Sequence, residues 1–224
     1  MTHPTAVIFD CDGTLLDSMD FWHSLDDRLA ARAGVALTKA DRDYLTACTM
    51  EECGAYFHEQ LGVGASAADV VNAFDDELLR FYQHEVQPKP GACELVRALA
   101  DAGVPMAVAS STPPRLLRTG LERAALADAM EAIVSVEDVH SSKREPLVYD
   151  TARAALGTER AETWGVEDAL YAVRTLKRAG YRTLAVFDSM TAGTPEELAA
   201  EADVFVMSLE EALTWRRERD TPSQ

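Results

Sequence analysis

The 224-residue chain lacks several features that would assign it to broad classes of protein. It has only four cysteines, and none forms a Cys-x-x-Cys pair, so the sequence predicts reduced thiols in a cytoplasm rather than disulfides or a zinc site. Basic residues number 21 against 38 acidic ones, and the net charge of −17 argues against a nucleic-acid partner. No apolar run approaches the ~20 residues that cross a bilayer, and no signal peptide is visible. We therefore expect a cytoplasmic protein with no membrane partner.

What is present is the composition of a folded protein, with 47% hydrophobic and 26% charged residues. Short apolar runs recur, each ending at an acidic or small residue. They lie at residues 6–9, 105–109, 132–136, 163–166, 183–187 and 204–207. Such continuous runs are typical of strands buried on both faces, and helical segments separate them. The alternation predicts an α/β fold with a doubly wound, Rossmann-like parallel sheet, which binds ligands at the carboxyl ends of its strands.

One stretch of the chain breaks this alternation. Residues 17–87 contain no strand-like run and instead show apolar residues at helical spacing, such as Trp22 and Leu25. Pairs such as Ser66 with Asp69 and Thr49 with Glu52 indicate helix starts. We therefore predict an all-helical cap domain inserted into an α/β catalytic core. The core would consist of residues 1–16 and 88–224, and the cap of residues 17–87.

The first predicted strand ends in a pair of carboxylates, Asp10 and Asp12, followed by Gly13. Side chains at i and i+2 of an extended chain project to the same side, and glycine allows a tight turn with positive φ. Two like charges about 4 Å apart repel by roughly 4 kcal/mol at an effective dielectric of 20. A proton or a divalent cation would relieve that repulsion. The alternative is an ordinary solvated turn at a strand end.

Four motifs in order along the chain resemble those of the haloacid dehalogenase superfamily, in its branch of phosphatases with a helical cap. The resemblance covers essentially the whole chain. Its motifs are the run Asp10-x-Asp12-Gly13-Thr14, Ser110 at the end of the second strand, Lys143, and the acidic pair Glu167-Asp168.

The resemblance implies three catalytic residues. Asp10 would attack phosphorus and form an aspartyl-phosphate. Asp12 would protonate the leaving alcohol and later deprotonate the attacking water. Lys143 would set a positive charge against the phosphate and Asp10, although lysine in so polar a stretch is also typical of a solvated surface.

The same resemblance implies a set of substrate-binding residues: Gly13, Thr14, Ser110, Ser111, Trp22 and Thr49. Ser110 would bind a phosphate oxygen, with the adjacent Ser111 as a competitor for that role. The helix predicted to begin near Pro113 would present its N-terminus to the phosphate. Helix capping is the alternative explanation for Ser110, and packing within the cap is the alternative for Trp22.

The resemblance further implies that Mg²⁺ is the cofactor. Asp10, Asp168 and the backbone carbonyl of Asp12 would bind it, with Glu167 as an outer-sphere or additional ligand. Carboxylate oxygens and substrate phosphate are the ligands that Mg²⁺ prefers, and only Lys143 opposes the negative charge gathered there.

The sequence therefore predicts a Mg²⁺-dependent phosphatase for a small-molecule phosphate ester, as a monomer or weak homo-oligomer. One alternative is a sugar phosphomutase of the β-phosphoglucomutase type. Such mutases usually carry histidine where Trp22 stands, which counts against it. A third possibility is a protein that binds a phosphate ligand without catalysis.

Overall fold

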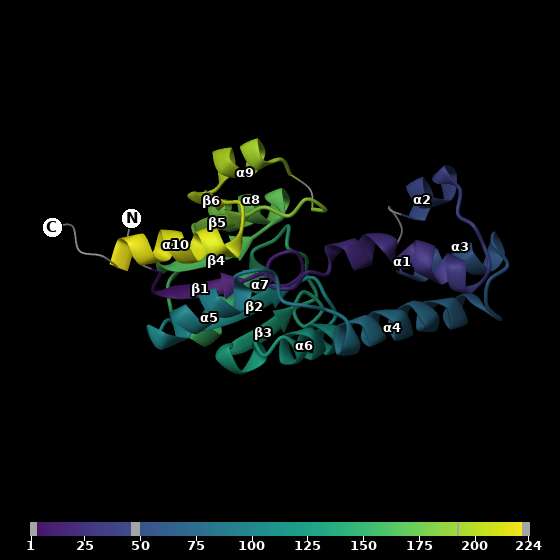
Figure 1. Ribbon diagram of the computed structural model, residues 1–224, viewed down its shortest axis with the longest axis horizontal. Helices are drawn as coiled ribbons and strands as arrows, with labels where there is room; N and C mark the ends of the chain where they lie inside the picture. The colour runs from purple at the N-terminus through teal and green to yellow at the C-terminus, as the bar shows by residue number, and fades with distance from the viewer. Residues whose placement is uncertain (1–3, 46–49, 192, 221–224) are drawn as a thin grey trace. The chain divides into compact units, whose positions relative to one another are not determined.

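The structure is a computed structural model that describes residues 4–45, 50–191 and 193–220 (Figure 1). The chain divides into two compact units. One unit consists of residues 1–19 and 86–224, and the other of residues 20–85. Among the described residues, no helix is both long enough and apolar enough to cross a membrane.

The larger unit is built on a parallel sheet of six strands in the order β3-β2-β1-β4-β5-β6. The strands are β1 (Ala6–Phe9), β2 (Met106–Ser110), β3 (Ala132–Ser135), β4 (Thr163–Glu167), β5 (Arg182–Val186) and β6 (Val204–Val206). Each strand overlaps one of the six apolar runs, with ends that differ by at most one residue, so the predicted α/β fold is confirmed. Two of the polar residues singled out in the sequence, Ser110 and Glu167, are the last residues of β2 and β4.

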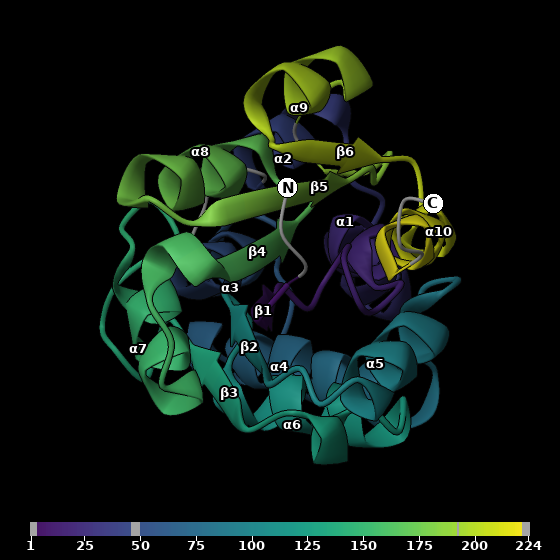
Figure 2. The same cartoon turned by 90° about the vertical axis from the view of Figure 1, so that its left-hand side faces the viewer.

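Helices cover both faces of this sheet (Figure 2). Their bounds are α5 (Ala92–Asp101), α6 (Pro114–Arg123), α7 (Leu147–Leu156), α8 (Leu170–Ala179), α9 (Pro195–Glu201) and α10 (Leu209–Asp220). Helices α7 and α8 lie on one face, and α5 and α10 lie on the other. Both faces of the central strands are therefore buried, which explains why their sequences are apolar without alternation.

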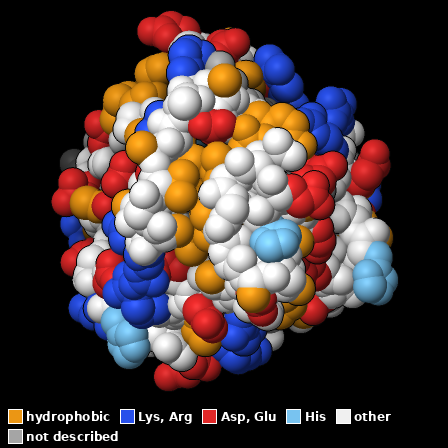
Figure 3. Space-filling view, turned by 90° about the vertical axis from the view of Figure 1, so that its right-hand side faces the viewer, with side chains coloured by type: hydrophobic (Ala, Val, Ile, Leu, Met, Phe, Trp, Pro, Cys, Tyr) orange, Lys and Arg blue, Asp and Glu red, His pale blue; other side chains and the backbone are white. Residues whose placement is uncertain are grey.

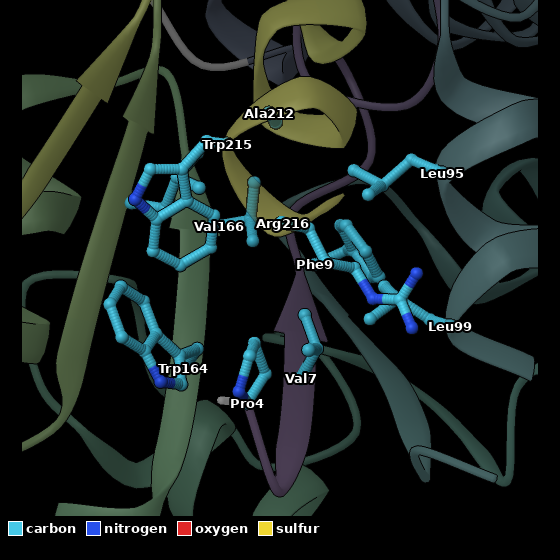
Figure 4. A pocket seen from close by; sticks show the side chains of 11 residues that line it. Pro4, Val7, Phe9, Leu95, Leu99, Trp164, Val166, Ala212, Trp215 and Arg216 are labelled. Atoms are coloured by element: carbon cyan, nitrogen blue, oxygen red, sulfur yellow. The ribbon is translucent and has the colours of Figure 1, made fainter. Parts of the chain in front are cut away.

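Strand β1 shows how its side chains divide between the two faces. Ile8 packs into the core on the α7 side, whereas Val7 and Phe9 line an apolar pocket on the α5 and α10 side (Figure 4). Trp164 of β4 and Trp215 of α10 meet in that pocket, with ring centroids 5.1 Å apart. Because both faces of β1 are packed with apolar side chains, charged groups can lie only at its ends.

The strand order places a topological switch point between β1 and β4. From β1 the sheet grows outward through β2 and β3, and from β4 it grows the other way through β5 and β6. Connections on either side of such a point diverge and leave a crevice beyond the carboxyl ends of the two strands. Asp10, directly after β1, and Glu167, at the end of β4, stand at that crevice.

The smaller unit is helical among its described residues. It contains α2 (Lys39–Leu45), α3 (Met50–Glu59), α4 (Ala67–His84) and nearly all of α1 (Met19–Arg32). The predicted start at Ser66 is confirmed, because its side chain accepts a hydrogen bond from the Asp69 backbone N–H at 3.1 Å. The start predicted at Thr49 lies outside the described residues. On the face shown in Figure 3, acidic and basic side chains are interspersed.

A buried carboxylate joins α1 to α4 within the helical unit. Glu77 is 2% exposed and accepts a hydrogen bond from Arg80 at 2.9 Å. Arg32 of α1 forms an ion pair with the same carboxylate, and Arg28 lies 3.9 Å from it. The hydrogen bond from Arg80 is the main reason that the pKa of Glu77 is lowered. Ion pairs with Arg28 and Arg32 thus link α1 to α4 at a buried carboxylate.

The close approach of α8 to β4 yields a prediction about stability. A Cβ atom on Gly165 would lie 2.4 Å from Cδ1 of Leu176, a fully buried side chain. We expect Gly165→Ala to lower the free energy of unfolding by about 1–3 kcal/mol, as overpacking does. Urea denaturation measures this. In a Leu176→Ala background the added methyl group should cost less, since the clashing atoms are gone. An equal cost in both backgrounds would contradict the packing explanation.

Candidate active site

The loop after β1 presents the first two carboxylates of the site. The backbone N–H of Asp10 donates to the Val166 carbonyl of β4 at 2.9 Å, which ties the loop to the neighbouring strand. Gly13 has φ +87°, and a Cβ atom there would lie 2.2 Å from Oδ2 of Asp168. The predicted turn with positive φ is therefore present. The missing side chain of Gly13 makes room for Asp168.

A buried lysine joins two of the carboxylates. Nζ of Lys143 donates to Oδ1 of Asp10 and, at 2.6 Å, to Oε1 of Glu167. Only 4% of the Lys143 side chain is exposed. Burial alone would lower the pKa of this lysine, but the charges of Asp10 and Glu167 outweigh burial and raise it. Lys143 therefore stays protonated and supplies a fixed positive charge inside the site.

The two carboxylate oxygens of Glu167 differ in their hydrogen bonds. Its Oε1 accepts from Lys143 and also from the hydroxyl of Tyr149 at 2.7 Å. Its Oε2 is buried and has no hydrogen-bond partner among the described residues. Burial raises the pKa of Glu167, and Asp10 raises it further while Lys143 opposes the shift. An orphaned buried oxygen of this kind calls for a proton, a water or a cation.

Asp168 completes an acidic cluster with Asp10 and Glu167. One carboxylate oxygen from each lies within 4.8 Å of the others, and all three residues are buried. Burial, followed by the charges of Asp10 and Glu167, raises the pKa of Asp168 well above its ordinary value. Three crowded carboxylates with one orphaned oxygen form a donor set of hard oxygens that suits Mg²⁺. The residues present therefore fit the cation that the sequence predicted.

Hydroxyl groups hold Asp168 on both sides. Thr14 donates to its Oδ1 at 3.2 Å, and Thr191 donates to its Oδ2 at 2.5 Å. Thr14 is fully buried, and its hydrogen bond to Asp168 orients its hydroxyl toward the acidic cluster. These two bonds fix the rotation of the carboxylate but add no charge to the cluster.

Asp12 is held in the same way by hydroxyls from two different segments. Ser18 donates to its Oδ1 at 2.5 Å, and Thr112 donates to its Oδ2 at 2.5 Å. Between the two aspartates lies Cys11, whose pKa is raised, first by burial and then by Asp12 and Asp10. This thiol therefore stays neutral and is not a candidate nucleophile.

The loop after β2 leads into the N-terminus of α6, as predicted. Ser110 is 1% exposed, and its hydroxyl oxygen accepts from the Thr112 backbone N–H at 3.1 Å, which leaves its own proton for donation. The side chain of the neighbouring Ser111 is exposed. Ser135, the last residue of β3, donates to the Thr112 carbonyl at 2.8 Å and so ties this loop to the neighbouring strand.

The structure thus brings Asp10, Lys143, Glu167 and Asp168 together, although up to 158 residues separate them in the chain. Trp22, proposed to bind substrate, lies in the helical unit, where its indole N–H donates to the Tyr82 hydroxyl at 2.9 Å. Thr49, the other predicted cap residue, lies outside the described residues.

Sequence reasoning missed the functions of several hydroxyl side chains. Ser18 belongs to the conspicuous run after β1, and Tyr149 lies six positions after Lys143, so both had a signal in the sequence. Thr191 had none, because it follows Asp168 by 23 residues in a loop with no motif.

A doubly wound sheet with carboxylates and a lysine at its switch point is typical of proteins that bind an anionic ligand together with a cation. The sequence profile of haloacid dehalogenase-like hydrolases matches residues 7–186. The chain therefore belongs to the haloacid dehalogenase-like hydrolases. The family and the enzyme class, a hydrolase, are as the sequence predicted.

Individual relatives agree with this assignment. Hexitol phosphatase B of Escherichia coli K12 is 27% identical over 183 residues, which cover 81% of this chain and 82% of the relative. β-Phosphoglucomutase of Bacillus subtilis is 27% identical over 187 residues, covering 78% of this chain and 80% of the relative. A family hydrolase of Deinococcus radiodurans, crystallised with bound phosphate and sodium, shares the fold with a TM-score of 0.75 at 24% identity. That match covers 99% of this chain and 100% of the Deinococcus protein.

The acidic cluster predicts how pH affects the stability of the metal-free protein. Glu167 has its pKa raised from 4.5 to about 7, so the folded state holds a proton that the unfolded state has lost in this interval. Stability contributed by the cluster should therefore fall as the pH rises from 4.5 to about 7. Mg²⁺ binds the ionised carboxylates, so the increase in Tm on adding Mg²⁺ should be larger at pH 7.5 than at pH 5.5.

Thermal denaturation with and without Mg²⁺ at both pH values tests this expectation. Glu167→Gln removes one of the two carboxyl groups whose pKa is raised and leaves Asp168, so it should reduce the difference between the two pH values. A Mg²⁺-induced shift of the same size at both would contradict it.

Proposed function

We propose that this protein is a Mg²⁺-dependent phosphatase that hydrolyses a small phosphomonoester through a phospho-aspartate on Asp10. The observation that carries the proposal is the buried cluster in which Lys143 joins Asp10 to Glu167, beside Asp168. A carboxylate at neutral pH needs no base to become a nucleophile. It does need a positive neighbour to approach a phosphate, and Lys143 supplies that charge.

In the first step an oxygen of Asp10 attacks phosphorus, and the bond between phosphorus and the ester oxygen breaks. Asp12 gives its proton to the departing alkoxide. In the second step water attacks the phosphorus of the aspartyl-phosphate, and Asp12 takes a proton from that water. The bond between Asp10 and phosphorus then breaks, and inorganic phosphate leaves. Asp12 ends the cycle protonated again, so one residue serves as acid and base in turn.

The loop after β2 and the N-terminus of α6 would bind the phosphoryl oxygens. Ser110 is buried and keeps its hydroxyl proton for donation, whereas the side chain of Ser111 is exposed. The loop containing them precedes α6, whose first backbone N–H groups lack partners within the helix. Ser110 is therefore the stronger of the two serine candidates.

Mg²⁺ would be held by Asp10, Asp168 and the backbone carbonyl of Asp12, with Glu167 as an additional ligand. The orphaned Oε2 of Glu167 supports this assignment. When bound, the cation would offset the negative charge of the cluster and of the substrate phosphate.

We assign residues 17–87 the function of a cap that shields the reaction from bulk water and selects the substrate. The relatives include a hexitol phosphatase and a β-phosphoglucomutase, which favours a sugar or sugar-alcohol phosphate as substrate. The mutase relative also keeps phosphomutase activity as the second candidate. That enzyme would interconvert isomeric sugar phosphates and release little inorganic phosphate.

The first prediction from this mechanism concerns the nucleophile. Asp10→Asn should lower the rate of phosphate release from sugar phosphates and from an aryl phosphate by at least about 10³-fold, roughly 4 kcal/mol of transition-state stabilisation. Removal of Mg²⁺ with EDTA should also abolish the activity, and added Mg²⁺ should restore it. Asp101→Asn, on the exposed end of α5, is the matched control and should leave the rate unchanged. Full activity in Asp10→Asn would refute the proposal.

The second prediction separates the two steps assigned to Asp12. An aryl oxide is a good leaving group that needs little protonation, whereas hydrolysis of the aspartyl-phosphate still needs a base. Asp12→Asn should therefore release aryl alcohol in a burst of about one equivalent per enzyme and then stall. Rapid-quench kinetics and trapping of phosphoenzyme measure this. Asp10→Asn should show no burst, and steady turnover by Asp12→Asn would contradict the assigned base.

A further inference from the structure

The loop between β5 and α9 contacts the acidic cluster, although no motif marks it. Thr191 of this loop donates to Oδ2 of Asp168 at 2.5 Å, and Thr14 donates to the other oxygen at 3.2 Å. Asp168 is 2% exposed, so protein groups and not bulk water orient its carboxylate. A hydroxyl on each oxygen fixes the plane of the carboxylate while leaving lone pairs for a cation.

Helix capping does not account for Thr191. The start of α9 is satisfied by Thr194, whose side chain accepts from the Glu197 N–H while the Glu197 side chain accepts from the Thr194 N–H. This reciprocal pair needs no further residue upstream. The hydroxyl of Thr191 is therefore available for Asp168.

A second carboxylate, Asp188, fixes the position of Thr191. The carbonyl of Asp188 accepts from the Thr191 N–H at 3.3 Å, and its Oδ1 accepts from the Met190 N–H at 2.8 Å. Asp188 thus closes the turn that carries Thr191. It is only 7% exposed, and burying an ionised carboxylate is costly unless the charge is paired or hydrogen-bonded.

That partner is Lys89, whose Nζ donates to Oδ2 of Asp188. Lys89 lies between Pro88 and Pro90, where the chain returns from the helical unit. Its backbone N–H donates to the Leu15 carbonyl at 2.8 Å, in the loop after β1. The flanking prolines restrict the backbone on both sides. Lys89 therefore stands on a fixed segment and holds the turn at 188–191 in place.

We infer that Thr191 is a positioning residue for Asp168, and that the ion pair of Lys89 with Asp188 sets where Thr191 stands. The segment at which the chain returns from the helical unit thereby contributes to the affinity of the metal site. The inference rests on the proposed function, because it takes Asp168 to be a Mg²⁺ ligand. Groups that orient a metal ligand typically change metal affinity about 10–100-fold when removed.

The test is isothermal titration calorimetry of Mg²⁺ into the metal-free 224-residue chain. Thr191→Val should raise the Kd for Mg²⁺ about tenfold, because it removes the hydroxyl and keeps the shape. Thr191→Ser should retain the wild-type Kd, since it keeps the hydroxyl. Thr119→Val, at a half-buried threonine of α6 whose hydroxyl donates to the Arg115 carbonyl, is the matched control and should bind as wild type does. Circular dichroism verifies that each variant is folded.

A double mutant tests whether the two contacts act in series. Lys89→Met should raise the Kd for Mg²⁺ by a smaller factor than Thr191→Val, because its effect is transmitted through the turn. The double variant should bind Mg²⁺ no more weakly than Thr191→Val alone. Both changes act through the same hydrogen bond to Asp168, so their effects on the binding free energy are not additive. The titration of the wild-type protein tests the Mg²⁺ site itself. If the wild type binds no Mg²⁺, the proposed function fails, whatever the variants do. If the wild type binds Mg²⁺ and Thr191→Val binds it equally well, or if the two changes add, the inference is wrong.

Discussion

The ion pairs of buried Lys143 with Asp10 and Glu167 are the interaction on which the site depends. Removing charges from water costs several kcal/mol for each ion, and one lysine cannot balance three carboxylates. The imbalance is visible in Glu167 and Asp168, whose pKa values are raised. The cluster therefore holds protons or accepts a cation, and it favours the cation as the pH rises. The excess of negative charge in this site therefore favours binding of a cation.

The fold explains why such a costly cluster forms. Apolar strands with both faces covered leave no place for charge inside the sheet, so polar side chains collect where the strands end. The switch point brings the ends of β1 and β4 together, and with them Asp10 and Glu167. The chain between β3 and α7 supplies Lys143 to the same crevice. Strand order, and not proximity in sequence, therefore brings Asp10, Lys143 and Glu167 together.

The same reasoning shows what could be predicted from sequence and what could not. The six strands followed from runs of apolar residues, because burial on both faces leaves a direct imprint on composition. Asp10, Asp12 and Gly13 could be found because two carboxylates so close in the chain repel each other, and that repulsion requires a proton or a cation. Lys143 required the resemblance to a family, because a lone lysine in a polar stretch has no such pattern. Thr191 could not be found, because its bond to Asp168 depends on the path of a loop.

The choice of hydroxyls around Asp12 follows from the task proposed for it. A lysine or arginine in contact with this carboxylate could only donate, and it would favour the ionised form throughout the cycle. The hydroxyls of Ser18 and Thr112 donate to the carboxylate as the structure shows. Each can also rotate and accept a hydrogen bond when Asp12 is protonated. Both protonation states of Asp12 therefore keep a hydrogen-bond partner. A residue that gives up and regains a proton in every turnover needs a hydrogen-bond partner in both states. In the proposed mechanism Lys143, and not a group on Asp12, supplies the positive charge.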